Sequence, residues 1–196
     1  MSHATLMDPD LSAGLRARLE EIEAIKRDAR ELFDGLSDAQ ANWRPHPRRW
    51  SIAQCLDHIV LSGEPYLRSI EAMIGEARRR AALKQPPFRP GRLSGWFIRS
   101  VEPPPRFKAK TFRSMEPGEG RPAAEALARF LALHDALAAL IRSAQGIDPH
   151  GGRAPSPFFR LLRLTLDQSI ALVTTHARRH LWQARQVRQQ PAFPAA

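Results

Sequence analysis

The chain has 196 residues, of which 43% are hydrophobic and 26% are charged, and these values are typical of one folded domain rather than of a disordered protein. No apolar run approaches the length of a membrane span, and residues 1–8 lack the basic and apolar regions of a secretion signal. We therefore expect one cytoplasmic domain over residues 1–196 with no membrane partner. The single cysteine, Cys55, excludes an intrachain disulfide and a multi-cysteine zinc site, so a metal would need imidazole or carboxylate ligands.

The formal net charge of +10 raises nucleic-acid binding as one alternative function. Arginine accounts for 26 of the 30 basic residues, in a chain that is also rich in alanine and proline, and we interpret the excess as a composition bias spread over every segment. No arginine run alternates with stacking aromatics, and no known nucleic-acid module is visible. We therefore expect no nucleic-acid partner; the alternative predicts a contiguous basic face and steep salt dependence.

Residues 9–36 are expected to form the first long helix. Apolar residues recur there at spacings of three and four, which is the pattern of one buried helical stripe: Leu11, Leu15, Leu19, Ile22, Ile25, Ala29, Leu32 and Leu36. Residues 37–42 are expected to add one short turn. The proline-punctuated stretch from Trp43 to Trp50 follows, and we expect both tryptophans to cover the core and His46 to be exposed.

The second long helix is expected over residues 51–80. Ser51 and Gln54 have the spacing of a capping box, and Pro65 should kink the helix or interrupt its hydrogen bonding. His58 falls beside the apolar stripe, on a line with Cys55 and Ser62. Such a histidine is a candidate ligand at the rim of an interior cavity, although a lone histidine at a core boundary is commonly structural.

Residues 84–120 are rich in proline and glycine, which excludes one long helix. We expect a long crossover with one short packed helix over residues 93–101. A connection of this length is usually functional or mobile, so we interpret it as a lid over the site or as an irregular crossover.

The third long helix is expected over residues 122–145, with Pro122 at its first position and Gly146 after its end. His134 shares its apolar face with Leu131 and Ile141, so we expect His134 to be buried without binding metal. Residues 147–164 are expected to be a second linker.

The fourth long helix is expected over residues 161–189, with Thr165 and Gln168 as a capping box. His176 and His180 are four residues apart, so they share one helix face, and the apolar residues around them direct that face into the core. Two imidazoles at this spacing can reach one metal ion. A pair without a neighbouring glutamate lacks the general base of the zinc-protease motif and also fits ordinary core or surface histidines, so a third ligand is needed.

Four long helices with histidines on the second and fourth predict an all-α four-helix bundle with a metal site in its core. Two patterns carry a family resemblance: Trp50-Ser51-Ile52 followed by His58, and His176-x-x-x-His180-Leu181-x-Gln183. With a weaker match in the proline-rich stretch 102–117, the chain resembles the DinB-like superfamily up to about Arg188. That group includes YfiT-type metal-dependent hydrolases and thiol S-transferases.

The resemblance implies a four-helix bundle with a long crossover connection, and a metal held by three histidines at the positions of His58, His176 and His180. It also implies a small-molecule substrate, a low-molecular-weight thiol as one candidate, and a homodimer. Three imidazoles favour zinc, while nickel, iron, manganese and cobalt also accept them. The resemblance does not choose between hydrolysis and S-transfer. The main alternative is a non-enzymatic helical binding module with a structural or vestigial metal site, which predicts no cavity beside the histidines.

Overall fold

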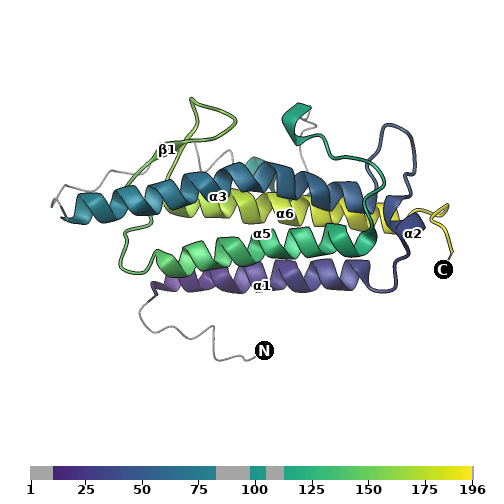
Figure 1. The fold of residues 1–196 in the computed structure, drawn as a ribbon, viewed down its shortest axis with the longest axis horizontal. Coiled ribbons are helices and arrows are strands. Elements are labelled where there is room, and N and C mark those ends of the chain that lie inside the picture. The colour runs from purple at the N-terminus through teal and green to yellow at the C-terminus, as the bar shows by residue number, and fades with distance from the viewer. Residues whose placement is uncertain (1–10, 83–97, 105–112, 196) are drawn as a thin grey trace.

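The computed structural model describes residues 11–82, 98–104 and 113–195, and within them the fold is a bundle of four long helices (Figure 1). The chain is mainly helical, as the sequence predicts. The long helices are α1 (Ala13–Phe33), α3 (Ile52–Ala82), α5 (Ala123–Ser143) and α6 (Leu166–Arg188). No helix in this part of the chain is long and apolar enough to cross a membrane.

The four helices form a closed ring in which α1 and α3 are each packed against both α5 and α6. Figure 1 shows that α1 and α6 run in one direction, and that α3 and α5 run in the other. Because α3 and α5 are parallel neighbours, the chain between them must return along the length of the bundle. This requirement is the physical reason for a long crossover at that point in the sequence.

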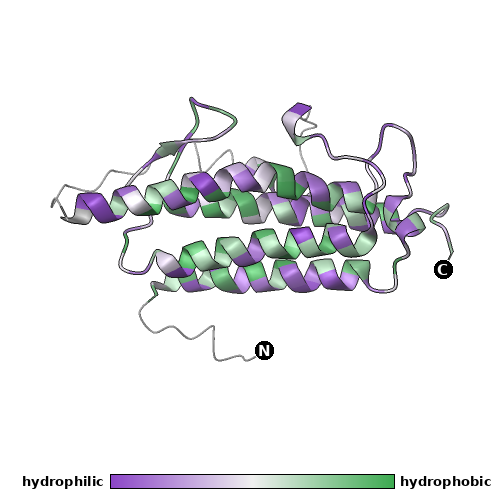
Figure 2. Ribbon diagram, in the orientation of Figure 1, coloured by the Kyte–Doolittle hydropathy of each residue, from purple (hydrophilic) through white to green (hydrophobic). Residues whose placement is uncertain are grey.

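Two hydrophobic clusters fill the bundle, one toward each end. The first combines the C-terminal halves of α1 and α6 with the N-terminal halves of α3 and α5, and the second combines the opposite halves. Figure 2 shows hydrophobic and hydrophilic residues alternating along each long helix, as expected where one face is buried. Within the first cluster and at its boundary with the second, the four helices carry buried or partly buried polar side chains, and we call this set the polar layer: Lys26, His58, Ser62, His134, His176 and His180.

Local sequence signals place the helix ends. The capping boxes of Ser51 with Gln54 and of Thr165 with Gln168 form both of their reciprocal hydrogen bonds. Gly146 follows the end of α5 with a φ of +74°, a left-handed conformation that glycine adopts without steric cost. Pro122 is the N-cap of α5 rather than its first residue, and it gives no side-chain cap.

The fourth long helix begins at Leu166, five residues later than residue 161 in the sequence-based range. The preceding residues pair instead as a short antiparallel hairpin, with β1 at Ala154–Pro155 and β2 at Arg163–Leu164. The hairpin fits the chain because Thr165 is the N-cap of α6, which leaves residues 163–164 extended. The hairpin was not anticipated.

Two other segments agree with the expectations, and the kink or interrupted hydrogen bonding expected at Pro65 stays a prediction. The short helix α2 (Asp38–Asn42) lies in the first linker, and its Asp38 side chain accepts a hydrogen bond from the backbone nitrogen of Ala123 at 2.7 Å. This bond supplies the cap that Pro122 cannot give to α5. The helix α3 continues through Pro65 without ending. Trp43 and Trp50 are partly buried against the first cluster, and His46 is exposed.

Much of the crossover lies outside the described residues, so the lid interpretation of residues 84–120 is not tested. Within the described part, residues 98–101 are helical, which matches the end of the short helix expected over 93–101. Ile98 and Val101 are packed against the second cluster. The 3-10 turn η2 (Arg113–Met115) ends on the buried side chain of Met115, close to the start of α3.

Candidate metal centre

The side chains of His58, His176 and His180 converge in the polar layer between α3 and α6. One ring nitrogen from each lies within 4.8 Å of the other two. The ring centroids are 5.1 Å apart for His58 and His176, 4.6 Å for His58 and His180, and 4.7 Å for His176 and His180. Two helices that are distant in sequence therefore bring three imidazoles to one point.

Helical phase and core packing explain this convergence. His176 and His180 are one turn apart on α6, and the neighbouring Ala177 and Leu181 are fully or nearly fully buried in the first cluster. On α3, Leu56 and Ile59 are buried in the same cluster on either side of His58. These apolar neighbours fix the rotation of each helix, so the imidazoles cannot turn to the surface.

The hydrogen bonds of the rings show which nitrogens face the common point. Nδ1 of His58 lies 2.8 Å from the carbonyl oxygen of Met115, to which it can only donate. Nε2 of His176 and Nε2 of His180 face each other at 3.1 Å. At most one of these two nitrogens carries a proton toward the other, so at least one lone pair points into the gap. The Nε2 atoms of His176 and His180 therefore offer at least one acceptor to a common point, and the proton of His58 lies on the opposite side of its ring.

Burial keeps the three rings neutral near physiological pH. Desolvation lowers the pKa of His176 to about 3, and it lowers the pKa of His58 and brings the pKa of His180 well below its ordinary value. The positive charge of Arg179 acts in the same direction on all three rings. Neutral imidazole is the form that binds a metal ion, so the donor chemistry fits a divalent cation.

Trp50 lies against the histidines, whereas the neighbouring Asp57 faces α5. The indole of Trp50 lies 4.7 Å from the His58 ring and 5.6 Å from the His180 ring, measured between centroids. The carboxylate of Asp57 is 3% exposed and forms ion pairs with Arg121, just before α5, and with Arg129 within it. Asp57 therefore does not point toward the metal group but holds α3 against α5.

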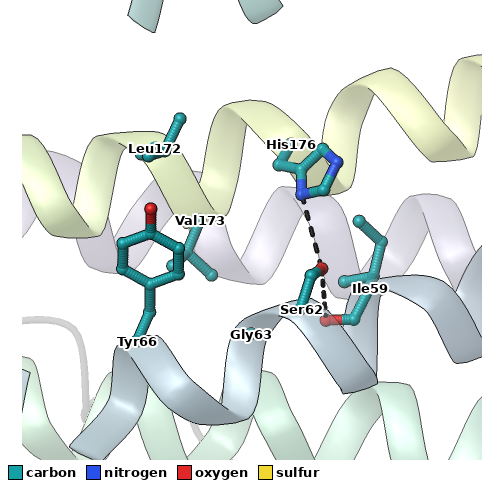
Figure 3. A pocket seen from close by; sticks show the side chains of 7 residues that line it. All are labelled: Ile59, Ser62, Gly63, Tyr66, Leu172, Val173 and His176. Carbon is teal, nitrogen blue, oxygen red and sulfur yellow. Dashed lines mark hydrogen bonds between the residues drawn. The ribbon is translucent and has the colours of Figure 1, made fainter. Parts of the chain in front are cut away.

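A small cavity adjoins the inner side of His176 (Figure 3). It has room for about one water molecule, so it cannot hold an organic substrate. In Figure 3 the Ser62 hydroxyl points at the His176 ring across this space, 3.4 Å from Nδ1. The lining side chains come from α3 and α6: Ile59, Ser62, Gly63, Tyr66, Leu172, Val173 and His176.

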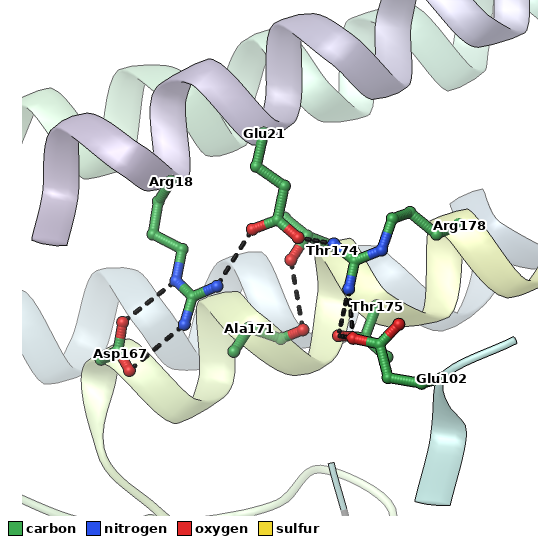
Figure 4. A network of polar contacts seen from close by, with 8 residues as sticks. All are labelled: Arg18, Glu21, Glu102, Asp167, Ala171, Thr174, Thr175 and Arg178. Carbon is green, nitrogen blue, oxygen red and sulfur yellow. Dashed lines mark hydrogen bonds and ion pairs between the residues drawn. The ribbon is translucent and has the colours of Figure 1, made fainter. Parts of the chain in front are cut away.

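A polar network on the other face of α6 fixes that helix against α1 (Figure 4). Arg18 of α1 lies 3.1 Å from Asp167 and 3.0 Å from Glu21. Arg178 of α6 pairs with both Glu21 and Glu102. The hydroxyl of Thr175, beside His176, donates to Glu102 at 3.2 Å. Glu102 therefore ties the described part of the crossover to the helix that carries two of the histidines.

The remaining candidates of the sequence analysis lie elsewhere. Cys55 is fully buried in the first cluster, where desolvation raises its pKa, and it is not part of the metal group. His134 is fully buried on α5, and its Nδ1 donates to the carbonyl oxygen of Phe130 rather than joining the three histidines. The side chain of Gln183 raises the pKa of His180, against the larger effect of burial, which lowers it. Nδ1 of His180 forms no hydrogen bond with the described residues.

The role of Met115 has no signal in the sequence. No local pattern marks a backbone carbonyl as the partner of a histidine 57 positions away. The sequence places Ser62 on the His58 face of the helix and gives no sign of its contact with His176. The ion pairs of Asp57 also went unassigned, because the partner arginines lie on another element and only tertiary packing brings them together.

Comparison with known proteins agrees with this arrangement. No curated protein sequence matches the chain significantly. One solved structure with a matching fold is YfiT from Bacillus subtilis, described as a probable metal-dependent hydrolase with an unusual four-helix bundle topology. Its sequence is 14% identical to this one, and the two structures superpose with a TM-score of 0.58. The match covers 92% of this chain and 89% of the YfiT chain. The sequence profile of the DinB superfamily matches residues 21–184, a span that contains all three histidines. The chain therefore belongs to the DinB superfamily.

Proposed function

We propose that the protein binds one divalent metal ion through His58, His176 and His180 and uses it to hydrolyse a small molecule. The observation that carries this proposal is the convergence of three neutral imidazoles from two helices, those of His58 and His180 buried and that of His176 partly buried, with ring nitrogens within 4.8 Å of one another. The fold that the chain shares with YfiT, described as a probable metal-dependent hydrolase, supports the reaction class. The alternative reaction at the same site is transfer of a thiol to a small molecule.

Three histidine ligands are typical of catalytic rather than structural zinc sites, because they leave a coordination position open. A bound divalent ion would lower the pKa of a water or thiol at that position and would polarise the substrate. Zinc is the first choice on ligand type, and nickel, iron, manganese and cobalt also accept imidazole.

The protein residues around the site would hold and shield this centre. The hydrogen bond from His58 to the Met115 carbonyl orients one ligand ring, and the Trp50 indole covers the rings of His58 and His180. Arg179 adds a positive charge near the three rings. That field favours substrates or leaving groups with negative charge.

A structural metal site is the second candidate, and the size of the cavity favours it. The space beside His176 holds about one water molecule, which suffices for neither substrate nor product. On this reading the ion would only join α3 to α6. The two candidates make the same prediction for metal binding and different predictions for catalysis.

The first test is metal content. We expect the purified protein to contain about one equivalent of divalent metal by mass spectrometry, and His176→Gln and His180→Gln each to lose most of it. His134→Gln is the matched control, because it also removes a histidine from the polar layer and should retain the metal. Equal metal loss in all three folded variants would show that the ligand set is wrong.

The second test separates the candidates. The metal-loaded protein is assayed against ester, amide and phosphate substrates, with and without a low-molecular-weight thiol. Metal-dependent turnover that is absent in His180→Gln supports an enzyme, and a strict requirement for the thiol selects transfer over hydrolysis. A metal that raises thermal stability while no substrate turns over selects the structural role.

Light scattering on the same sample tests the homodimer that the family resemblance implies.

A further inference from the structure

We propose that Ser62 is a positioning residue for His176, whose hydroxyl holds that imidazole with its proton on Nδ1 and its lone pair on Nε2. The inference rests on the proposed metal site, because the Nε2 lone pair is what a metal ion would bind. Ser62 itself touches neither the common point of the three rings nor a substrate.

The position of Ser62 is defined by three short contacts. Its side chain is buried, with 4% of the residue exposed, one turn after His58 on α3. Its Oγ lies 2.8 Å from the carbonyl oxygen of His58 and 3.3 Å from that of Ile59. The same Oγ lies 3.4 Å from Nδ1 of His176 on the facing helix.

Counting protons assigns the direction of these bonds. A serine hydroxyl has one proton to donate, and carbonyl oxygens can only accept, so the Ser62 proton goes to the backbone of α3. The Oγ lone pairs are then what faces His176. Nδ1 of His176 must therefore donate, and a neutral imidazole that donates from Nδ1 has its lone pair on Nε2.

The proton positions on His58 and His180 determine what the Ser62 contact adds to the site. The Met115 carbonyl fixes the proton of His58 on Nδ1, and no described residue bonds Nδ1 of His180. Nε2 of His176 faces Nε2 of His180 at 3.1 Å, and protons on both nitrogens would place two N–H groups against each other. Among the residues that the structure describes, Ser62 is thus the side chain whose hydroxyl sets the tautomer at this pair.

Ser62 also connects two ligands to each other. It bonds the backbone of the turn that carries His58 and the ring of His176, so α3 and α6 are linked through one hydroxyl. Polar partners of this kind orient metal ligands, and their removal typically reduces metal affinity about 10- to 100-fold.

The test compares Ser62→Ala with Ser62→Thr, which retains the hydroxyl, and with Ser169→Ala as a matched control. Ser169 is also buried and also donates to the carbonyl four residues earlier, Thr165, but it lies away from the histidines. Nitrogen-15 NMR of the metal-free protein reports the tautomer of His176, and chelator competition with zinc reports affinity. We expect wild type, Ser62→Thr and Ser169→Ala to have the proton on Nδ1 and similar affinity. Ser62→Ala should show a mixture of tautomers and bind zinc about 10- to 100-fold more weakly.

Two results would overturn the inference. One is a wild-type protein with the His176 proton on Nε2, which needs no variant and decides the matter even if Ser62→Ala fails to fold. The other is equal loss of zinc affinity in Ser62→Ala and Ser169→Ala, which would make the effect one of general helix stability. If the wild type binds no zinc, the proposed function fails, whereas the NMR readout still decides the role of Ser62.

Discussion

His134 is a fully buried histidine with one unsatisfied nitrogen. Its Nδ1 lies 2.8 Å from the carbonyl oxygen of Phe130, whose ring is 4.2 Å away between centroids, and its Nε2 has no hydrogen-bond partner among the described residues. Desolvation lowers its pKa to about 4; the charge of Lys26 acts in the same direction, and the Phe130 carbonyl and Asp135 oppose it. The ring is therefore neutral in the folded protein at pH 7, and protonating it in place would be costly.

This lowered pKa predicts how stability depends on pH. A histidine in the unfolded chain has a pKa near 6.5, whereas folded His134 has a pKa of about 4. Between these two pH values the unfolded chain binds a proton that folded His134 does not bind. The free energy of unfolding therefore decreases as the pH is lowered. The full effect is at most about 3 kcal/mol. His134→Gln cannot titrate, so the wild type should lose more stability than the variant on going from pH 7.5 to pH 4.5.

The measurement is urea denaturation of both proteins with a metal chelator present, so that the three site histidines contribute equally and cancel in the difference. A gap between wild type and His134→Gln that stays constant across this pH range would contradict the assignment of a neutral buried ring.

At the residue scale, sequence reasoning worked where helical phase decides and failed where tertiary partners decide. The spacing of His176 and His180 and the apolar stripe around them were sufficient to direct both rings inward. The family resemblance, not the phase, supplied His58 as the third member. The partners that set the proton positions, the Ser62 hydroxyl and the Met115 carbonyl, become neighbours only after α3, α6 and the crossover have packed.

At the scale of elements, the contact between α3 and α5 depends on Gly63. A Cβ built on Gly63 would lie 2.7 Å from Cδ2 of Leu133, which is closer than side chains normally approach. Leu133 is 4% exposed in the first cluster and has little room to move. The glycine thus allows the two parallel helices to approach closely, at the cost of a weaker helix at that point.

We therefore expect Gly63→Ala to destabilise the protein by about 1–2 kcal/mol, because overpacking outweighs the gain of roughly 1 kcal/mol in helix propensity. Urea denaturation measures the change. In a Leu133→Ala background the clash is absent, so there the same substitution should be neutral or stabilising. A loss of equal size in both backgrounds would show that Leu133 is not what makes alanine unfavourable at this position.

The helix ends that the sequence predicted well are those with a local signal. Thr165 with Gln168, Ser51 with Gln54, and Gly146 each mark a helix end through bonds or backbone angles within a few residues. The hairpin before α6 was missed because its strands, Ala154–Pro155 and Arg163–Leu164, are two residues long and carry no alternating pattern.

For the whole molecule, the positive charge is concentrated rather than spread, which corrects the interpretation of it as a bias in every segment. Residues 78–113 contain 11 basic residues and one acidic residue, Glu102, and the rest of the chain contains 19 of each sign. The net charge of +10 therefore belongs to the end of α3 and the crossover, whereas the remainder of the bundle is balanced. The pattern of apolar residues that predicts the helices does not reveal this concentration of basic residues in one span.

We expect this span to govern the binding of polyanions. Replacing Arg106, Lys108 and Lys110 by glutamine should lower the salt concentration at which the protein elutes from heparin. The same number of substitutions at the exposed residues Arg30, Arg48 and Arg160 should have a smaller effect, because the chain outside residues 78–113 carries equal numbers of basic and acidic residues. Equal shifts in the two triple variants would mean that only the total charge matters.

The two helices that supply the histidines have a further consequence for the chain as a polymer. His58 and His176 are more than a hundred positions apart, and the intervening residues include the crossover and all of α5. An ion that joined them would close a long loop, as a disulfide bond does in other proteins. This chain has a single cysteine and cannot form an intrachain disulfide. Unlike a disulfide, this closure would depend on the free metal concentration, adding about 2.7 kcal/mol to the folded state at a hundred times the dissociation constant. The bundle would then have a stability set partly by the metal supply of its surroundings.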